Sequence, residues 1–184
     1  LALYLYTGNS HIFKQVNKTL LNWQSNTLWQ PFINCLYQAV NLIDVFDKEV
    51  YRAVDIPFNL EDYKIGNKIV WNTFSVTSYE WKSANDLINL NRGIIFVVKG
   101  KTGRNISKYS KNPVECEVMF LPGTEFTITN YYVASATCLG QENIRKTTFK
   151  ITEKEILKAV NQQAAIIVEL TEVIDNTEIE ELTN

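Results

Sequence analysis

Residues 114–123 read Val-Glu-Cys-Glu-Val-Met-Phe-Leu-Pro-Gly, a β-rich run that carries two carboxylates and stops at a Pro-Gly turn. Alternation along a strand places residues two apart on one face, so we expect Glu115 and Glu117 to share a face and Cys116 to occupy the other. Two neighbouring carboxylates repel each other unless a cation or a ligand hydroxyl lies between them, which makes the pair a candidate for acid-base chemistry. The alternative is an exposed strand end whose glutamates face water.

Two further β-rich runs carry polar residues where a buried strand would carry apolar ones. Arg52 lies within residues 50–54, and residues 74–78 read Phe-Ser-Val-Thr-Ser. An unpaired buried charge is costly, so an inward-facing arginine needs a partner or a ligand. Alone, Arg52 is equally compatible with a structural role between strands, and hydroxyls are common at strand edges.

Around these runs, the periodicity predicts an α+β domain that begins with helices. Apolar residues recur at helical spacing over 12–23 and 32–43, which indicates two amphipathic helices. Strand-like runs follow at 50–54, 69–77, 94–98, 114–121, 126–133, 147–151 and 164–170. Residues 83–90 could form a short helix, residues 100–113 are a loop candidate, and Thr152 with Glu155 forms a capping box that starts a late helix.

Composition sets the broad class of the chain. Its 184 residues are 46% hydrophobic and 21% charged, which fits one folded domain and excludes intrinsic disorder. A net charge of −2 gives no support for a nucleic-acid partner, and no apolar run is long enough to span a membrane. We expect residues 1–171 to form the domain and residues 172–184, which are acidic, to form a tail or linker.

Familiar catalytic templates are absent from the sequence. It has no Gly-rich phosphate loop and no Cys-x-x-Cys pair, and its single histidine, His11, has no second histidine with which to bind a metal. We therefore expect no metal. Three cysteines in a chain of this size favour reduced thiols and, weakly, action in the cytosol. The first residue is Leu rather than Met, so the chain could be a domain of a longer protein.

The order of these motifs resembles that of the mono-ADP-ribosyltransferases of the Arg-Ser-Glu group. The resemblance covers most of the chain and rests on the combination of segments rather than on any single one. Those segments are Tyr4-Leu5-Tyr6-Thr7, Val50-Tyr51-Arg52, Phe74 to Ser78, Glu115-Cys116-Glu117 and Leu121-Pro122-Gly123-Thr124-Glu125-Phe126. The resemblance implies a split β-sandwich with flanking N-terminal helices, and NAD bound as co-substrate in the cleft between two small sheets.

The resemblance also implies a role for residues along that cleft. Arg52 would hold the cofactor, and Glu117 would stabilise the positively charged transition state of nicotinamide release while contacting a ribose hydroxyl. The remaining residues expected to line the NAD site are Ala53, Ser75, Thr77 and Ser78.

The resemblance also implies that Glu115 and the turn before it bind the acceptor of the ADP-ribose. A protonated guanidinium is a poor nucleophile, so a carboxylate such as Glu115 must orient it and take its proton. Family members with Glu at this position modify arginine, which makes a protein with an exposed arginine the expected substrate. Tyr109 would contact that acceptor.

Val76 is a departure from the family pattern. The first Ser of the usual Ser-Thr-Ser falls at this position, and valine cannot donate a hydrogen bond. Ser75 could take over by a one-residue shift, Thr77 and Ser78 could supply what is needed, or the site could be impaired. Of these we favour Ser75.

The expected activity is transfer of ADP-ribose from NAD to a protein arginine. One alternative is an NAD glycohydrolase, in which water replaces the acceptor, and another is a non-catalytic binding module. A secreted toxin and a translocated effector are both compatible with the sequence, which does not indicate the target or the oligomeric state.

Overall fold

A computed structural model describes residues 1–8, 10–22, 28–84, 93–134, 152–161 and 164–174. Within these ranges, the α-helices are α1 (Ala2–Gly8), α2 (Ser10–Leu21), α3 (Gln30–Asn41) and α6 (Glu153–Asn161). Two short 3-10 helices, η1 (Trp81–Ala84) and η2 (Pro113–Glu115), accompany them. None of the described helices is both long and apolar enough to cross a membrane.

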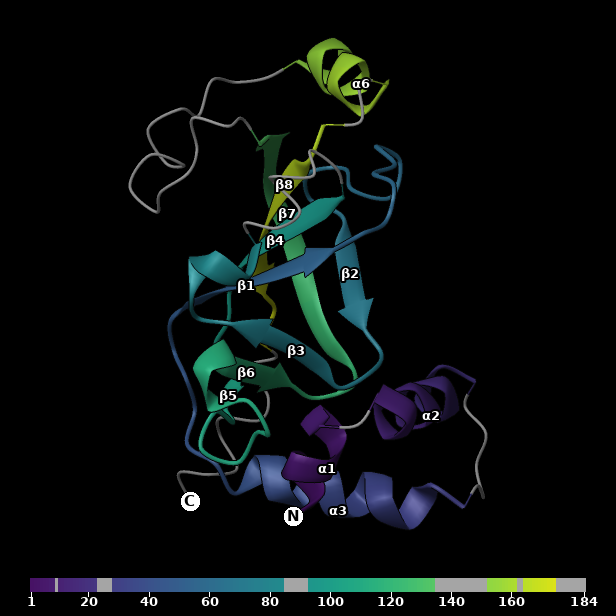
Figure 1. Cartoon of the computed structure of the whole chain (residues 1–184). Helices are drawn as coiled ribbons and strands as arrows, with labels where there is room; N and C mark the ends of the chain where they lie inside the picture. Colours follow the sequence, from purple (N-terminus) through teal and green to yellow (C-terminus); the bar gives the residue numbers. More distant parts are fainter. Residues whose placement is uncertain (9, 23–27, 85–92, 135–151, 162–163, 175–184) are drawn as a thin grey trace, which may run out of the picture.

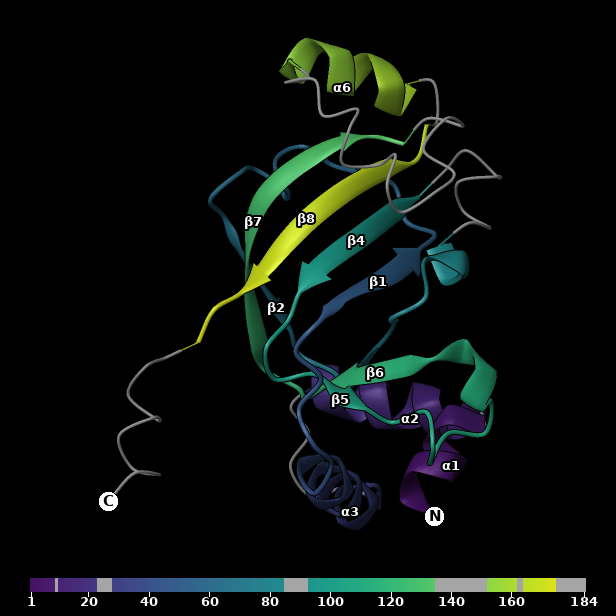
Figure 2. The ribbon, with the colours of Figure 1, turned by 90° about the vertical axis from the view of Figure 1, so that its left-hand side faces the viewer.

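The strands of the described residues form one mixed sheet in the order β2-β7-β8-β4-β1-β3-β6-β5. They are β1 (Glu49–Val54), β2 (Lys68–Trp71), β3 (Ser75–Ser78), β4 (Ile94–Lys99), β5 (Arg104–Asn105), β6 (Glu117–Phe120), β7 (Thr124–Val133) and β8 (Ile166–Glu172). β1 and β3 meet only through the pair Tyr51 and Ser78, whereas β1 and β4 pair along six residues. The sheet therefore divides between β1 and β3 into a five-stranded and a three-stranded half (Figures 1 and 2).

The two halves pack against each other through an aromatic core. Phe120 of β6 lies on the three-stranded half, and its ring centroid is 5.7 Å from that of Trp71 and 5.4 Å from that of Phe126, both on the five-stranded half. Val118 belongs to the same buried cluster. The predicted split β-sandwich is confirmed, because apolar residues of both halves face a shared core.

The N-terminal helices cover the outer face of the three-stranded half (Figure 1). Tyr6, Val16 and Leu36, one from each helix, are buried in a cluster with Phe74 and Met119. The flanking helices were predicted, although the structure has three where the periodicity indicated two. The additional helix, α1, spans only seven residues, too few to display a helical repeat.

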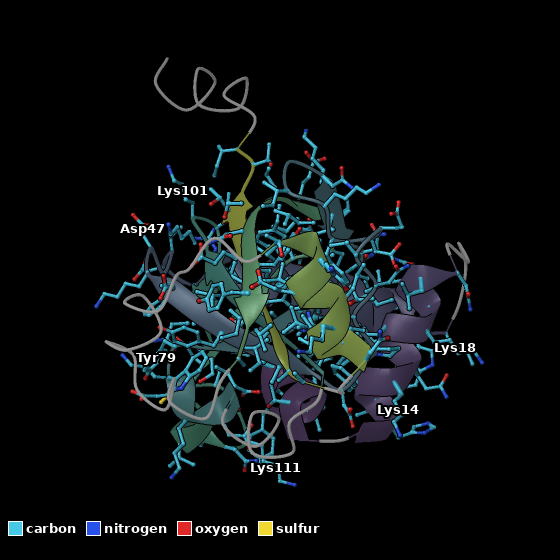
Figure 3. The ribbon with its side chains drawn as sticks, turned by 90° about the horizontal axis from the view of Figure 1, so that it is seen from above. Lys14, Lys18, Asp47, Tyr79, Lys101 and Lys111 are labelled. Atoms are coloured by element: carbon cyan, nitrogen blue, oxygen red, sulfur yellow. The ribbon has the colours of Figure 1, made fainter. Side chains whose placement is uncertain are left out.

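The polar faces of these elements point to solvent. The side chains of Lys14 and Lys18 extend outward from α2 (Figure 3). At the other end of the molecule, α6 begins with the predicted capping box, in which the main-chain N of Thr152 is 2.8 Å from a carboxylate oxygen of Glu155 (Figure 1).

Several predicted boundaries were wrong. The single run at 69–77 is two strands, because β2 pairs with β7 on one half and β3 pairs with β6 on the other. The loop candidate at 100–113 contains β5, which adds a short edge strand to β6. The predicted strand at 147–151 and most of the predicted helix at 83–90 lie outside the described residues.

The expected start of the tail at residue 172 also needs correction. β8 continues to Glu172, whose side chain is 7% exposed and accepts hydrogen bonds from the main-chain N–H groups of Lys101 and Thr102. Glu172 therefore belongs to the folded domain. Residues 175–184 lie outside the described residues.

Candidate active site

A cleft of about 850 Å³ opens where the sheet divides between β1 and β3. Six of the predicted site residues line it: Arg52, Ala53, Thr77, Ser78, Glu115 and Glu117. The first two lie on β1, the next two on β3, and the glutamates lie at the start of β6 and immediately before it. The fold thus assembles in one place residues that are up to 65 positions apart in the chain.

Arg52 carries the positive charge of the cleft. Its guanidinium carbon lies 4.8 Å from the centroid of the Trp71 ring, a stacking arrangement that holds the planar group in place. Burial lowers the pKa of Arg52, although the group remains a cation at neutral pH. Among the described residues no carboxylate lies within 4.0 Å of this guanidinium, so its charge is open to an anionic ligand.

Glu115 and Glu117 do not share a strand face, which corrects the prediction from alternation. Glu115 ends the 3-10 helix that opens at Pro113, and β6 begins only at Glu117. Cys116 between them has a left-handed backbone with φ of 54°, which breaks the alternation. As a result Glu115 is exposed, whereas Glu117 is only 8% exposed, and both still border the cleft.

Glu117 is held by a residue that the sequence analysis missed. The hydroxyl of Ser110, a buried residue of the loop before η2, donates a hydrogen bond to the Glu117 carboxylate. Burial raises the pKa of Glu117, the bond from Ser110 lowers it, and the negative charge of Glu115 raises it further. Nothing in the sequence marks Ser110, because a loop contact follows no periodic spacing.

The register of β3 against β6 decides which side chains of β3 can approach Glu117. Ser78 pairs with Glu117 and Val76 pairs with Met119, so these four residues share one face of the sheet. Ser75 and Thr77 are on the opposite face. The expected replacement of the missing hydroxyl by Ser75 therefore does not match the geometry.

The hydroxyls of β3 are engaged with the main chain instead. Ser75 donates to the Thr73 carbonyl at 3.1 Å, and Thr77 donates to the Val118 carbonyl at 2.8 Å. Ser78 donates to the Glu115 carbonyl at 2.8 Å, which ties the turn before β6 to β3. These bonds fix the walls of the cleft. Ser75 lines a neighbouring hollow of about 350 Å³ that it shares with Arg52.

Tyr109 lies on the loop next to the glutamates but outside the lining of the cleft. Its side chain is 53% exposed, and its main-chain N donates to the Ile106 carbonyl at 2.8 Å. An exposed tyrosine here is available to a second molecule that approaches Glu115. Its contact with the acceptor stays a prediction.

Known proteins resemble this chain in sequence and in fold. A family model described as NAD:arginine ADP-ribosyltransferase matches residues 1–138. A protein of Mycobacterium avium (strain 104), named provisionally as the NAD(+)--arginine ADP-ribosyltransferase Mav, is 28% identical over 130 residues. That match covers 70% of this chain and 15% of Mav, so the chain corresponds to a small part of this relative.

Solved structures resemble the whole fold. The ADP-ribosyltransferase HopU1 of Pseudomonas syringae pv. Tomato DC3000 aligns with a TM-score of 0.67 at 20% identity, covering 94% of this chain and 75% of HopU1. The Vis toxin of Vibrio splendidus, an ADP-ribosyltransferase, aligns with a TM-score of 0.64 at 17% identity, covering 96% of this chain and 73% of Vis. Another Vis structure is a complex with agmatine. The family model spans three quarters of the chain, and the chain belongs to the NAD:arginine ADP-ribosyltransferase family.

Proposed function

We propose that this domain cleaves NAD and transfers ADP-ribose to an arginine of a protein, releasing nicotinamide. One observation carries the proposal: a single cleft holds a guanidinium without a carboxylate partner among the described residues and, across from it, a buried carboxylate. Opposite charges kept apart on the walls of a cleft suit a ligand that carries both an anionic and a cationic part.

The cleft fits NAD in size and in chemistry. Its volume of about 850 Å³ lies within the usual range for cofactor sites, which is roughly 300–1,000 Å³. Arg52 would bind a phosphate group, for which a planar fork of N–H donors is suited. Ala53, Thr77 and Ser78 would form the walls that confine the sugar and the nicotinamide.

Glu117 would act at the bond between nicotinamide and ribose. Cleavage of such a glycosidic bond develops positive charge on the sugar, and a nearby anion stabilises that charge. Because Glu117 is buried and its position is fixed by a hydrogen bond, the stabilisation needs little reorganisation during the reaction.

Glu115 would serve the acceptor. It is exposed at the mouth of the cleft, where its carboxylate accepts a hydrogen bond of 2.9 Å from the side-chain amide of Asn112. From this position it can bind an incoming guanidinium and take its proton, while Tyr109 contacts the same side chain from the loop.

The partner would be a protein with an exposed arginine, and the setting that of a toxin or an effector. Mav is named for arginine, and Vis is titled a toxin. In such a setting the domain would act in the cytosol of a target cell.

The experiment that tests the proposal follows both products of NAD. Labelled NAD is incubated with the domain, and released nicotinamide is measured beside label transferred to agmatine, an arginine mimic. Glu117→Gln is the control and should lose both activities. Glu115→Gln should lose transfer and keep nicotinamide release, because it leaves the buried carboxylate in place.

Other results would select the alternatives. Release without transfer in the wild-type protein would favour the glycohydrolase. No release and no transfer would overturn the proposal and favour a binding module, an option that Val76 motivates. Equal loss of both activities in Glu115→Gln would contradict its assignment to the acceptor.

A further inference from the structure

Val76 of β3 places a side chain without a hydroxyl on the face of the sheet that also carries Glu117 of β6. Val76 and Glu117 are diagonal neighbours across the β3 and β6 pair, a separation that a side chain as long as glutamate can span. A serine at position 76 would therefore be able to donate to the carboxylate. Valine cannot, and a carboxylate that is 8% exposed needs a donor to stay ionised and oriented.

We propose that Ser110, on the loop that precedes η2, is the positioning residue for Glu117 and takes the place of the hydroxyl that Val76 lacks. The inference rests on the proposed function and extends it. Ser110 is buried, and its hydroxyl donates directly to the carboxylate. The donor reaches Glu117 from the loop instead of from β3.

Asn112 extends the contact to the second glutamate. Its main-chain N–H donates to the Ser110 hydroxyl at 3.2 Å, and its side-chain amide donates to the Glu115 carboxylate at 2.9 Å. Because the Ser110 oxygen accepts the hydrogen bond from Asn112, the Ser110 hydroxyl directs its own proton toward Glu117. One short segment, residues 110–112, thus orients both carboxylates of the cleft.

The segment is held firmly enough to do this. The main-chain N of Ser110 donates to the Ile106 carbonyl at 2.9 Å, and that of Lys111 donates to the Thr7 hydroxyl of α1 at 3.0 Å. Gly8 lies against the Lys111 side chain so closely that an added Cβ would be 2.5 Å from its Cδ atom. The loop is therefore packed on α1, and this packing fixes the position of Ser110 beside Glu117.

A nearby serine provides a matched control. Ser107 lies on the same loop and is also buried, but its hydroxyl donates to the main-chain carbonyl of Glu117, at 3.3 Å. Ser107→Ala removes one loop hydroxyl without touching the carboxylate. It separates a loss of loop structure from a loss of the bond to the Glu117 side chain.

The kinetic test compares three variants with the wild type. They are the single variants Ser110→Ala and Ser107→Ala, and the double variant that combines Ser110→Ala with Val76→Ser. A hydrogen bond to a charged group corresponds to about 10- to 100-fold in rate, so kcat for nicotinamide release should fall by about that factor in Ser110→Ala, with KM for NAD little changed. Ser107→Ala should stay within about twofold of wild type. Val76→Ser should restore activity to the Ser110→Ala background by returning a hydroxyl to the same face.

A second readout does not depend on catalysis. In protein without NAD and with carboxyl-labelled glutamate, ¹³C NMR reports the titration of Glu117. The charge of Glu115 of η2 acts on this carboxyl, and Tyr6 of α1 lies near both Glu117 and Arg52 of β1. The bond from Ser110 lowers the pKa of Glu117, so Ser110→Ala should raise it and move the acid limb of the kcat profile to higher pH. Ser107→Ala should leave the titration unchanged.

The outcomes separate this inference from the proposed function. A Ser110→Ala protein with wild-type kcat and an unmoved Glu117 titration would overturn the inference, as would a failure of Val76→Ser to restore activity. A wild-type protein that cleaves no NAD would overturn the proposed function instead, and the NMR titration would still decide whether Ser110 controls Glu117.

Discussion

Replacing Glu172 tests whether the end of β8 is part of the folded domain. The carboxylate accepts hydrogen bonds from the main-chain N–H groups of Lys101 and Thr102, the latter at 2.9 Å, and from the Thr102 hydroxyl. It thereby closes the turn between β4 and β5, beside Gly100, where an added Cβ would be 2.5 Å from the ring of Phe120. The Lys101 side chain itself points outward (Figure 3).

The size of the effect follows from these contacts. Glu172→Ala leaves two main-chain N–H groups without their acceptor, at about 1–2 kcal/mol each, while the Thr102 hydroxyl can rotate toward water. We expect a loss of about 3 kcal/mol in the free energy of unfolding, or roughly 6–12 °C in Tm for a domain of this size. Glu172→Gln keeps an oxygen for both N–H groups and an amide for the hydroxyl, so its loss should be about 1 kcal/mol.

The assay is urea unfolding followed by circular dichroism, with Glu125→Ala as the control. Glu125 lies on the neighbouring strand β7 and forms an ion pair of 2.5 Å with Lys68, but its side chain is 35% exposed. An ion pair this exposed contributes at most about 1 kcal/mol. If Glu172→Ala were no more destabilising than Glu125→Ala, residue 172 would behave as an exposed tail and the reasoning would be wrong.

Three further predictions concern the cleft. Arg52→Lys keeps the charge but loses the planar fork and its stacking on Trp71, so kcat/KM for nicotinamide release should fall about tenfold or more, with the fold intact by circular dichroism. Cys116→Val should lower the free energy of unfolding by about 1–2 kcal/mol, because φ of 54° disfavours a β-branched side chain, whereas Cys116→Gly should cost little; equal effects in urea unfolding would contradict this. Burial raises the pKa of Glu117, so its ionisation favours the unfolded state as pH rises above the usual carboxyl range. Glu117→Gln should therefore have a higher Tm than wild type at pH 7 and the same Tm at pH 4, and a lower Tm at pH 7 would refute this.

The elements that periodicity can detect were predicted well. Amphipathic spacing located α2 and α3, the apolar run at 94–98 matched β4, and Thr152 with Glu155 marked the start of α6. These features are local, because a helix face, a buried strand or a cap is specified by residues a few positions apart. Where tertiary pairing decided the outcome, as in the division of residues 69–77 between two halves of the sheet, the periodic pattern gave no indication.

The site shows the same contrast between what local sequence patterns predict and what tertiary pairing decides. From the sequence alone, the residue types and their order indicated the family: Arg52, then the hydroxyls of residues 74–78, then Glu115 and Glu117. They also named six of the thirteen residues that line the cleft. Chemistry that requires a cation and a carboxylate leaves that signature in the chain, because no other side chains supply those charges.

Only the tertiary structure decided which of these side chains meet. A left-handed residue at Cys116 separates Glu115 from Glu117, and the register of β3 turns Ser75 away from the carboxylate. Ser110 reaches Glu117 because the loop that carries it is packed on α1, about a hundred residues earlier in the chain. Backbone register and long-range packing set the direction of each side chain, and neither is encoded in the spacing of residue types along the sequence.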